Sequence, residues 1–255
     1  KLATIWWMAR YLAGQPADLP PRTLLMSLGV AGLPALLVFM QPDLGSATVL
    51  LAIWAGMVWV GGLSKRHLMT LAACVAGLLP LMWQALRPYQ RDRLLAFIDP
   101  HTDPLGAGYT VIQSQIAIGS GQWTGRGWFA GTQNHLNFLP ERHSDFLFSV
   151  IGEEWGLVGC LVVIGAFGVL LLRMLQIATH SSNPQGRLLT VGVFSWIAYQ
   201  AFVNMGMVMG LLPVVGIPLP LLSYGGSSMV TVWVGVMLVQ RVEAAERRLS
   251  RRLSA

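Results

Sequence analysis

The chain has 255 residues, of which 54% are hydrophobic and only 11% are charged, and its mean hydropathy is +0.58. Soluble domains carry about 25% charged residues, so this composition excludes an ordinary soluble enzyme and indicates several membrane-spanning helices. The formal net charge is +6. The basic residues stand in short clusters between apolar runs, a pattern that sets orientation in a membrane and argues against nucleic-acid binding.

Apolar runs without Asp, Glu, Lys or Arg predict the membrane spans, since a helix needs about 20 residues to cross the hydrocarbon core. Residues 1–14 are typical of the end of a truncated helix. Complete spans follow at 24–40, 44–63, 68–86 and 146–172. The charge-free run 188–240 is too long for one crossing, and four residues break it into two spans: Pro213, Gly216, Pro218 and Pro220. We therefore expect an all-α polytopic membrane protein, a single domain over 1–255, with six complete transmembrane helices and one truncated helix.

The basic residues predict the orientation of these spans. Alternating crossings place eleven Lys and Arg residues on one side of the membrane and five on the other, so the first side is cytoplasmic. The tail 241–255 is then a basic cytoplasmic segment that can touch anionic lipid. The long loop 87–145 is extracytoplasmic, and its length suggests a functional role. Within it, GYTVIQSQIAIGSG (108–121) fits either an interfacial helix or a short strand.

Charged residues gather where the 146–172 span begins: Glu141, Arg142, His143 and Asp145. Asp145 has two interpretations. An aspartate near a helix N-terminus caps free N–H groups and suits the helix dipole. At a partly desolvated membrane boundary, the same carboxylate could instead act as a general base.

Two further sets of acids are candidates. Asp43, in MQPDLGSA between two spans, is either a helix cap or shares a cavity with Asp145 on the same membrane face. Glu153 and Glu154 follow Asp145 by about 12 Å along a straight helix, where they either snorkel outward or face a cavity.

The glycine-rich segment GSGQWTGRGWFAG (119–131) lacks the Gly-Lys-Ser/Thr ending of a nucleotide P-loop. It is either a flexible turn or a site where backbone N–H groups and Arg126 hold a lipid-linked pyrophosphate. The histidines show no metal-ligand spacing, so the sequence leaves any metal ligands unknown.

Five segments carry a resemblance to a known family: QPDLGSA (41–47), YQRDRLLAFIDP (89–100), GAGYTVIQSQIAIGSG (106–121), FLPERHSDFLFSVIGEEWG (138–156) and PLPLLSYGGSS (218–228). Together they resemble the SEDS family of cell-wall glycosyltransferases over essentially the whole chain. The resemblance implies a ten-helix fold of which this chain is the C-terminal part, with the N-terminal helices missing. GTQNHLNFLPER and VVGIP are similar to the rod-shape branch of the family more than to its cell-division branch.

The resemblance also implies a function: polymerisation of lipid II into glycan strands during cell elongation, with release of undecaprenyl pyrophosphate. Asp145 corresponds to the family's essential acid and would deprotonate the acceptor hydroxyl. Lys1 matches the lysine that ends a family motif, and Asp43 matches a cavity position. Arg126 and Arg142 are candidates to offset the pyrophosphate charge by position alone. His143, Glu153 and Glu154 complete the substrate-binding candidates.

The same resemblance implies a divalent cation, Mg²⁺ or Mn²⁺, and a class B penicillin-binding protein transpeptidase with the elongation machinery as partners. It places the protein in the bacterial inner membrane, with Asp145 outside and the C-terminus in the cytoplasm. Two other functions stay open from the residues. Intramembrane acids and a basic cavity would also suit a lipid II flippase or other transporter. The chain could also be a non-catalytic scaffold for a penicillin-binding protein.

Overall fold

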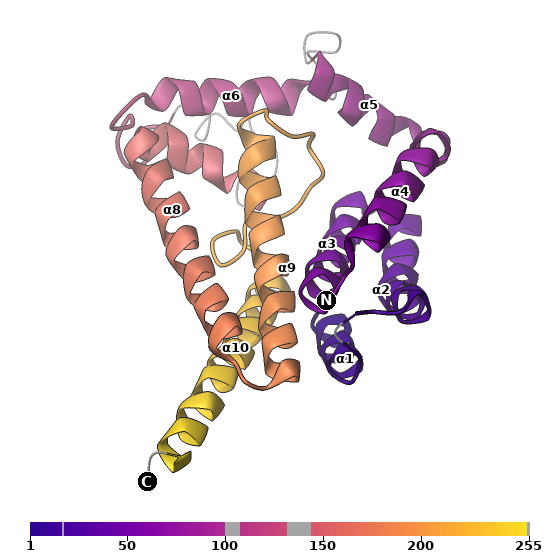
Figure 1. Ribbon diagram of the computed structural model, residues 1–255. Coiled ribbons are helices and arrows are strands. Elements are labelled where there is room, and N and C mark those ends of the chain that lie inside the picture. The colour runs from indigo at the N-terminus through magenta and orange to yellow at the C-terminus, as the bar shows by residue number, and fades with distance from the viewer. Residues whose placement is uncertain (17, 100–107, 132–143, 254–255) are drawn as a thin grey trace. The chain divides into compact units, whose positions relative to one another are not determined.

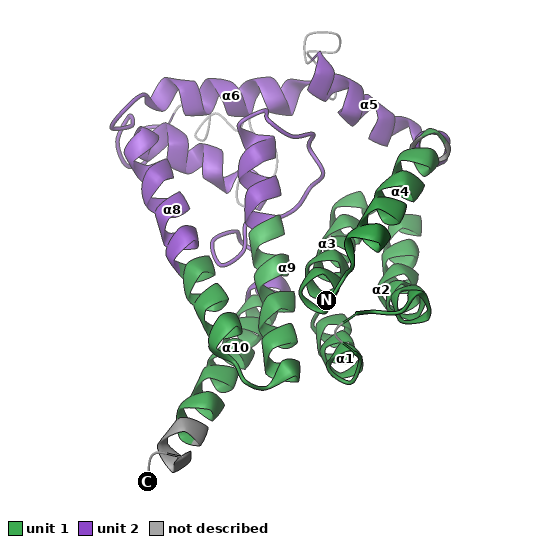
Figure 2. Cartoon of the chain, viewed as in Figure 1, with its two compact units in different colours: residues 1–82, 170–199, 230–255 green, residues 83–169, 200–229 purple. Residues whose placement is uncertain are grey.

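The computed structural model describes residues 1–16, 18–99, 108–131 and 144–253. These residues form α-helices and turns, without a strand in any of the described ranges. They fall into two compact units (Figure 2). Unit 1 comprises 1–82, 170–199 and 230–255, and unit 2 comprises 83–169 and 200–229. The predicted all-α class is confirmed.

The helices, labelled in Figure 1, follow the predicted order. Their bounds are α1 Leu2–Ala13, α2 Pro21–Met40, α3 Leu44–Val60, α4 Lys65–Ala85, α5 Pro88–Ile98, α6 Tyr109–Gly121, α8 Leu147–His180, α9 Pro184–Val208 and α10 Gly226–Leu253. In the described residues, four helices are long and apolar enough to span a membrane: α2, α8, α9 and α10. The polytopic class therefore agrees with the prediction, whereas six complete spans and one truncated span stay a prediction.

Unit 1 is held together by close helix packing. Helix α2 packs along α3, and α1 contacts both. A Cβ placed on Gly56 of α3 would stand 2.0 Å from the Oγ of Ser195 on α9, so a side chain at position 56 would force Ser195 to move. Small residues at helix contacts are typical of membrane proteins, in which packing replaces the hydrophobic effect as the main association force.

The segment 108–121, for which helix and strand were both open, forms helix α6. Its buried side chains, Val111, Ser114 and Ala117, recur every three residues and so lie on one helical face. Ser114 donates from its Oγ to the backbone oxygen of Val208 at 2.9 Å, which ties α6 to the end of α9.

The span predicted over 146–172 lies within α8, which is long and apolar enough to cross a membrane, but α8 is broken at Gly156 (φ 64°, ψ −157°). Figure 1 shows the change of direction. A straight helix would bond the N–H groups of Leu157 and Val158 to the carbonyls of Glu153 and Glu154. These N–H groups instead donate to the carbonyls of residues 122 and 123, at 2.9 and 3.2 Å.

The freed carbonyls find partners in the same loop. Glu153 O accepts from the N–H of Arg126 at 3.0 Å, and Glu154 O accepts from the N–H of Gly127 at 3.1 Å. The loop 122–127 therefore inserts into the hydrogen-bond ladder of α8, a recognised cause of a sharp kink. Glu153 and Glu154 precede this break, so their expected distance of about 12 Å along the helix from Asp145 stays a prediction.

Candidate functional site

Asp145 lies in a turn, two residues before the first helical residue of α8, and is half-buried. The turn is held through its backbone by two side chains from later in the chain. The Nδ2 of Asn204 donates to the carbonyl of Asp145 at 2.8 Å. The Oγ of Ser223 donates to the carbonyl of Ser144. Both bonds lie within unit 2, so the position of the acid is fixed by contacts distant in sequence.

The two anchoring side chains also shape the loop 209–225. Asn204, on α9, is fully buried, and its Nδ2 also donates to the carbonyl of Ile217 at 2.7 Å. Ser223 accepts from the N–H of Leu219 at 2.8 Å. Because buried polar groups need partners, each side chain couples the loop to the turn that carries Asp145. Sequence reasoning missed both residues, although both are polar side chains within the charge-free run 188–240.

Arg93, on α5, brings a positive charge to the same place. The Oδ2 of Asp145 lies 3.4 Å, and the Nη1 of Arg93 lies 4.0 Å, from the point where a Cβ on Gly216 would stand. Gly216 has φ +69°, a conformation that other residues adopt at a cost of about 1–2 kcal/mol. The glycine therefore permits the turn and leaves room beside both charged groups. Arg93 was not a sequence candidate, although it belongs to the segment YQRDRLLAFIDP.

An open groove of about 590 Å³ adjoins the turn. Leu147, Leu222 and Met229 give it an apolar lining, and Ser223, which bonds to Ser144, is part of its wall. The acid is thus next to a surface on which an apolar chain can lie.

Two predicted residues come together in unit 1. Asp43 caps α3, because its Oδ1 accepts from the N–H of Ser46 at 2.8 Å, which confirms the capping interpretation. Lys1 is close enough to Asp43 for their charges to interact, and its Nζ lies 5.8 Å from the centre of the Trp196 ring. A shared cavity for Asp43 and Asp145 stays a prediction, since the two residues belong to different units.

Three other candidates gather around the break in α8. Glu153 is fully buried, so the interpretation that it snorkels outward is wrong, while Glu154 is half-buried. The carboxylate of Glu153 lies against Gly131, where an added Cβ would stand 2.8 Å from Oε2. Arg126 is exposed in the inserted loop. These residues hold the loop 122–131 to α8.

Arg142 and His143, together with Glu141, lie outside the described residues. No three described His, Cys, Asp or Glu side chains come together as a metal site. The part of the site that the structure describes therefore does not fit a cation held by the protein alone. The expected Mg²⁺ or Mn²⁺ stays a prediction, and no chemical step below depends on it.

The comparison with known proteins decides the family. A family model described as "Cell cycle protein", covering FtsW, RodA and SpoVE, matches residues 1–248. The chain belongs to the FtsW/RodA/SpoVE, or SEDS, family. The resemblance inferred from the five motifs is thereby confirmed.

Curated members of the SEDS family match over most of the chain. The peptidoglycan glycosyltransferase MrdB of Escherichia coli K12 is 40% identical over 252 residues, which are 98% of this chain and 68% of MrdB. A probable peptidoglycan glycosyltransferase FtsW of Thioalkalivibrio sulfidiphilus is 45% identical over 211 residues, which are 82% of this chain and 52% of that protein.

Solved structures agree with the SEDS assignment. One solved structure shows a peptidoglycan synthase complex and is described as the structural coordination of polymerization and crosslinking. A chain of that complex matches with a TM-score of 0.76 and 34% identity. The match covers 95% of this chain and 68% of that chain. The rod shape determining protein RodA of Thermus thermophilus has a TM-score of 0.60 and 31% identity, covering 94% of this chain and 62% of RodA.

Proposed function

We propose that this chain is a peptidoglycan glycosyltransferase that polymerises lipid II into glycan strands during cell elongation and releases undecaprenyl pyrophosphate. The observation that carries the proposal is the fixed turn of Asp145, anchored by Asn204 and Ser223 and adjoining both Arg93 and an apolar groove. Relatives named peptidoglycan glycosyltransferases share the family, and similarity to MrdB and RodA supports the elongation branch.

Asp145 acts as the general base. Its carboxylate takes the proton of the 4-hydroxyl on the sugar of an incoming lipid II. The alkoxide oxygen then forms a bond to the anomeric carbon of the growing strand. The bond from that carbon to the pyrophosphate oxygen breaks, and undecaprenyl pyrophosphate leaves with the electron pair.

The leaving pyrophosphate needs positive charge, which Arg93 supplies beside Asp145. A guanidinium suits this task because its N–H groups form paired bonds to phosphate oxygens. Arg126, Arg142, His143 and Lys1 stay proposed substrate contacts. The groove of Leu147, Leu222 and Met229 accommodates part of the polyprenyl chain.

The protein is a multi-pass protein of the bacterial inner membrane, with Asp145 and the loop 87–145 outside the cytoplasm and the tail 241–255 inside it. The charge distribution supports this orientation. Exposed Trp128 packs on Trp155, with ring centres 5.6 Å apart, as expected of aromatic side chains at a membrane interface. Helices α3 and α4 also cross the membrane under this proposal.

The partner is a crosslinking enzyme, a class B penicillin-binding protein transpeptidase, acting with the elongation machinery. The neighbouring solved structure, titled for coordinated polymerization and crosslinking, supports a shared assembly.

Polymerisation of labelled lipid II by the purified full-length protein and its partner tests the function. We expect a ladder of glycan products with the wild type and none with Asp145→Asn. Translocation of labelled lipid II across liposomes without polymer would favour the flippase instead. Normal rod shape in cells expressing Asp145→Asn at the wild-type level would favour the scaffold.

A further inference from the structure

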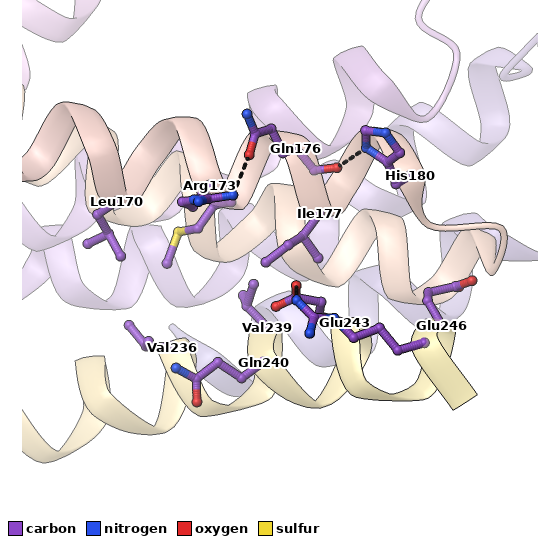
Figure 3. A pocket seen from close by; sticks show the side chains of 12 residues that line it. Leu170, Arg173, Gln176, Ile177, His180, Val236, Val239, Gln240, Glu243 and Glu246 are labelled. Carbon is purple, nitrogen blue, oxygen red and sulfur yellow. Dashed lines mark hydrogen bonds and ion pairs between the residues drawn. The ribbon is translucent and has the colours of Figure 1, made fainter. Parts of the chain in front are cut away.

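An open groove of about 810 Å³ lies between the C-terminal part of α8 and α10, entirely within unit 1 (Figure 3). It is separate in sequence from the residues of the proposed catalytic site. Leu170 and Val236 line one end of the groove, while His180 and Glu246 line the other. Its lining therefore changes from apolar to polar along its length.

The same change is visible in the two helices that form the groove. Helix α8 carries no charged residue between Glu154 and Arg173, and α10 carries none before Arg241. Both helices are long and apolar enough to span a membrane. Arg173 therefore stands where the apolar run of α8 ends, at the level at which lipid headgroups meet a membrane-spanning helix.

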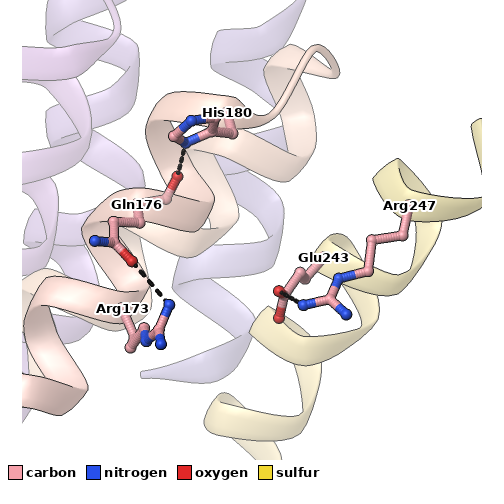
Figure 4. A network of polar contacts seen from close by, with 5 residues as sticks. All are labelled: Arg173, Gln176, His180, Glu243 and Arg247. Carbon is pink, nitrogen blue, oxygen red and sulfur yellow. Dashed lines mark hydrogen bonds and ion pairs between the residues drawn. The ribbon is translucent and has the colours of Figure 1, made fainter. Parts of the chain in front are cut away.

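The acidic side chains of the lining are engaged with other protein groups. The carboxylate of Glu246 accepts from the Oγ of Ser181 and of Ser182, at 3.0 and 2.6 Å, and from the N–H of Ser182 and of Asn183, at 3.1 and 3.2 Å. The Oε1 of Glu243 pairs with the Nη2 of Arg247 at 2.5 Å (Figure 4).

Arg173 has no carboxylate partner among the residues that the structure describes. Its Nη1 donates to the Oε1 of Gln176, a neutral group, at 3.2 Å. The Nδ1 of His180 lies 2.8 Å from the backbone oxygen of Gln176 (Figure 4), so Gln176 contacts both the guanidinium of Arg173 and the imidazole of His180. An exposed guanidinium with a fixed orientation and uncompensated charge fits a phosphate group.

We propose that this groove binds an anionic phospholipid, with the phosphate on Arg173 and one acyl chain along Leu170 and Val236. A diacyl lipid has the polarity that the groove shows along its length, whereas a partner helix would need an acidic residue placed opposite Arg173. The proposal does not depend on the proposed glycosyltransferase activity.

Native mass spectrometry of the full-length protein, released from nanodiscs of equal parts phosphatidylglycerol and phosphatidylethanolamine, tests the site. We expect retained phosphatidylglycerol in the wild type and about fivefold less in Arg173→Gln, whereas Arg173→Lys keeps most of it because the charge remains. Arg187→Gln removes the same charge from an exposed residue that does not line the groove, and should bind as the wild type does.

Each of the following lipid-binding results would overturn the proposal: equal retention of phosphatidylethanolamine, unchanged binding by Arg173→Gln, or an equal loss in Arg187→Gln. Capture of a second copy or of a partner helix in the groove, detected by crosslinking from position 240, would also overturn it. Unchanged thermal unfolding temperature in Arg173→Gln, expected for an exposed side chain, separates a binding loss from misfolding.

Discussion

Two turns of this molecule are each held by side chains from a distant segment, in opposite ways. At the α8–α9 turn, the carboxylate of Glu246 itself receives the hydrogen bonds of residues 181–183. At the turn before α8, Asn204 and Ser223 bind the backbone carbonyls of Asp145 and Ser144. The first acid is therefore structural. The position of Asp145 is fixed through its backbone, which leaves its carboxylate available for the proposed role as general base.

The largest loss of activity is expected when Asp145 is replaced. Because a general base contributes about 10²–10⁴-fold, Asp145→Ala should lower the polymerisation rate at least a hundredfold with little change in thermal unfolding temperature. Asp92→Ala, which removes an exposed acid from α5 in the same unit, should stay near the wild-type rate. A rate for Asp145→Ala within threefold of wild type would remove the residue from the mechanism.

Replacement of Asn204 should lower both the stability of the protein and its rate of polymerisation. Asn204→Leu keeps the branched shape but leaves the carbonyls of Asp145 and Ile217 without their donor, at about 1–3 kcal/mol of stability, and should reduce polymerisation about tenfold as the turn shifts. Thr190→Val, buried on the same helix with a bond only to Gly186, serves as the control. Full activity in an Asn204→Leu protein of lowered stability would show that the turn needs no such anchor.

Arg93 and Arg91 lie on the same helix, α5, but are expected to differ in role. Arg93→Ala should reduce polymerisation about tenfold at an unchanged unfolding temperature, because an exposed charge beside Asp145 is lost. Arg91→Ala removes bonds to the carbonyls of Trp83 and Gln84, at 3.1 and 2.8 Å. It should therefore lower the unfolding temperature more than it lowers the polymerisation rate. Equal activity of the two variants would contradict a role for Arg93 at the site.

The smallest expected effect on activity is at Glu246. Glu246→Gln weakens the four bonds to the α8–α9 turn and should lower the thermal unfolding temperature while the polymerisation rate stays unchanged. Glu243→Gln loses only an exposed ion pair with Arg247 and should change the unfolding temperature less. A large loss of activity in Glu246→Gln, with the fold intact, would mean that this acid is not merely structural.

The class of the protein and its family can be predicted from the amino-acid pattern. Composition and charge-free runs indicate membrane helices because the hydrocarbon core accepts little else, and five motifs carried the SEDS resemblance that the family model confirms. The cap at Asp43 was also within reach, since a cap is a contact between near neighbours in the chain.

The construction of the site depends on contacts that form only when the chain folds. Hydropathy treats 146–172 as one helix, but the break at Gly156 depends on bonds from residues 122–127, which local pattern does not encode. Asn204, Ser223 and Arg93 come from three separate segments and meet around Asp145 only after folding. An amide, a hydroxyl and a guanidinium have many possible partners in a sequence, and packing selects one.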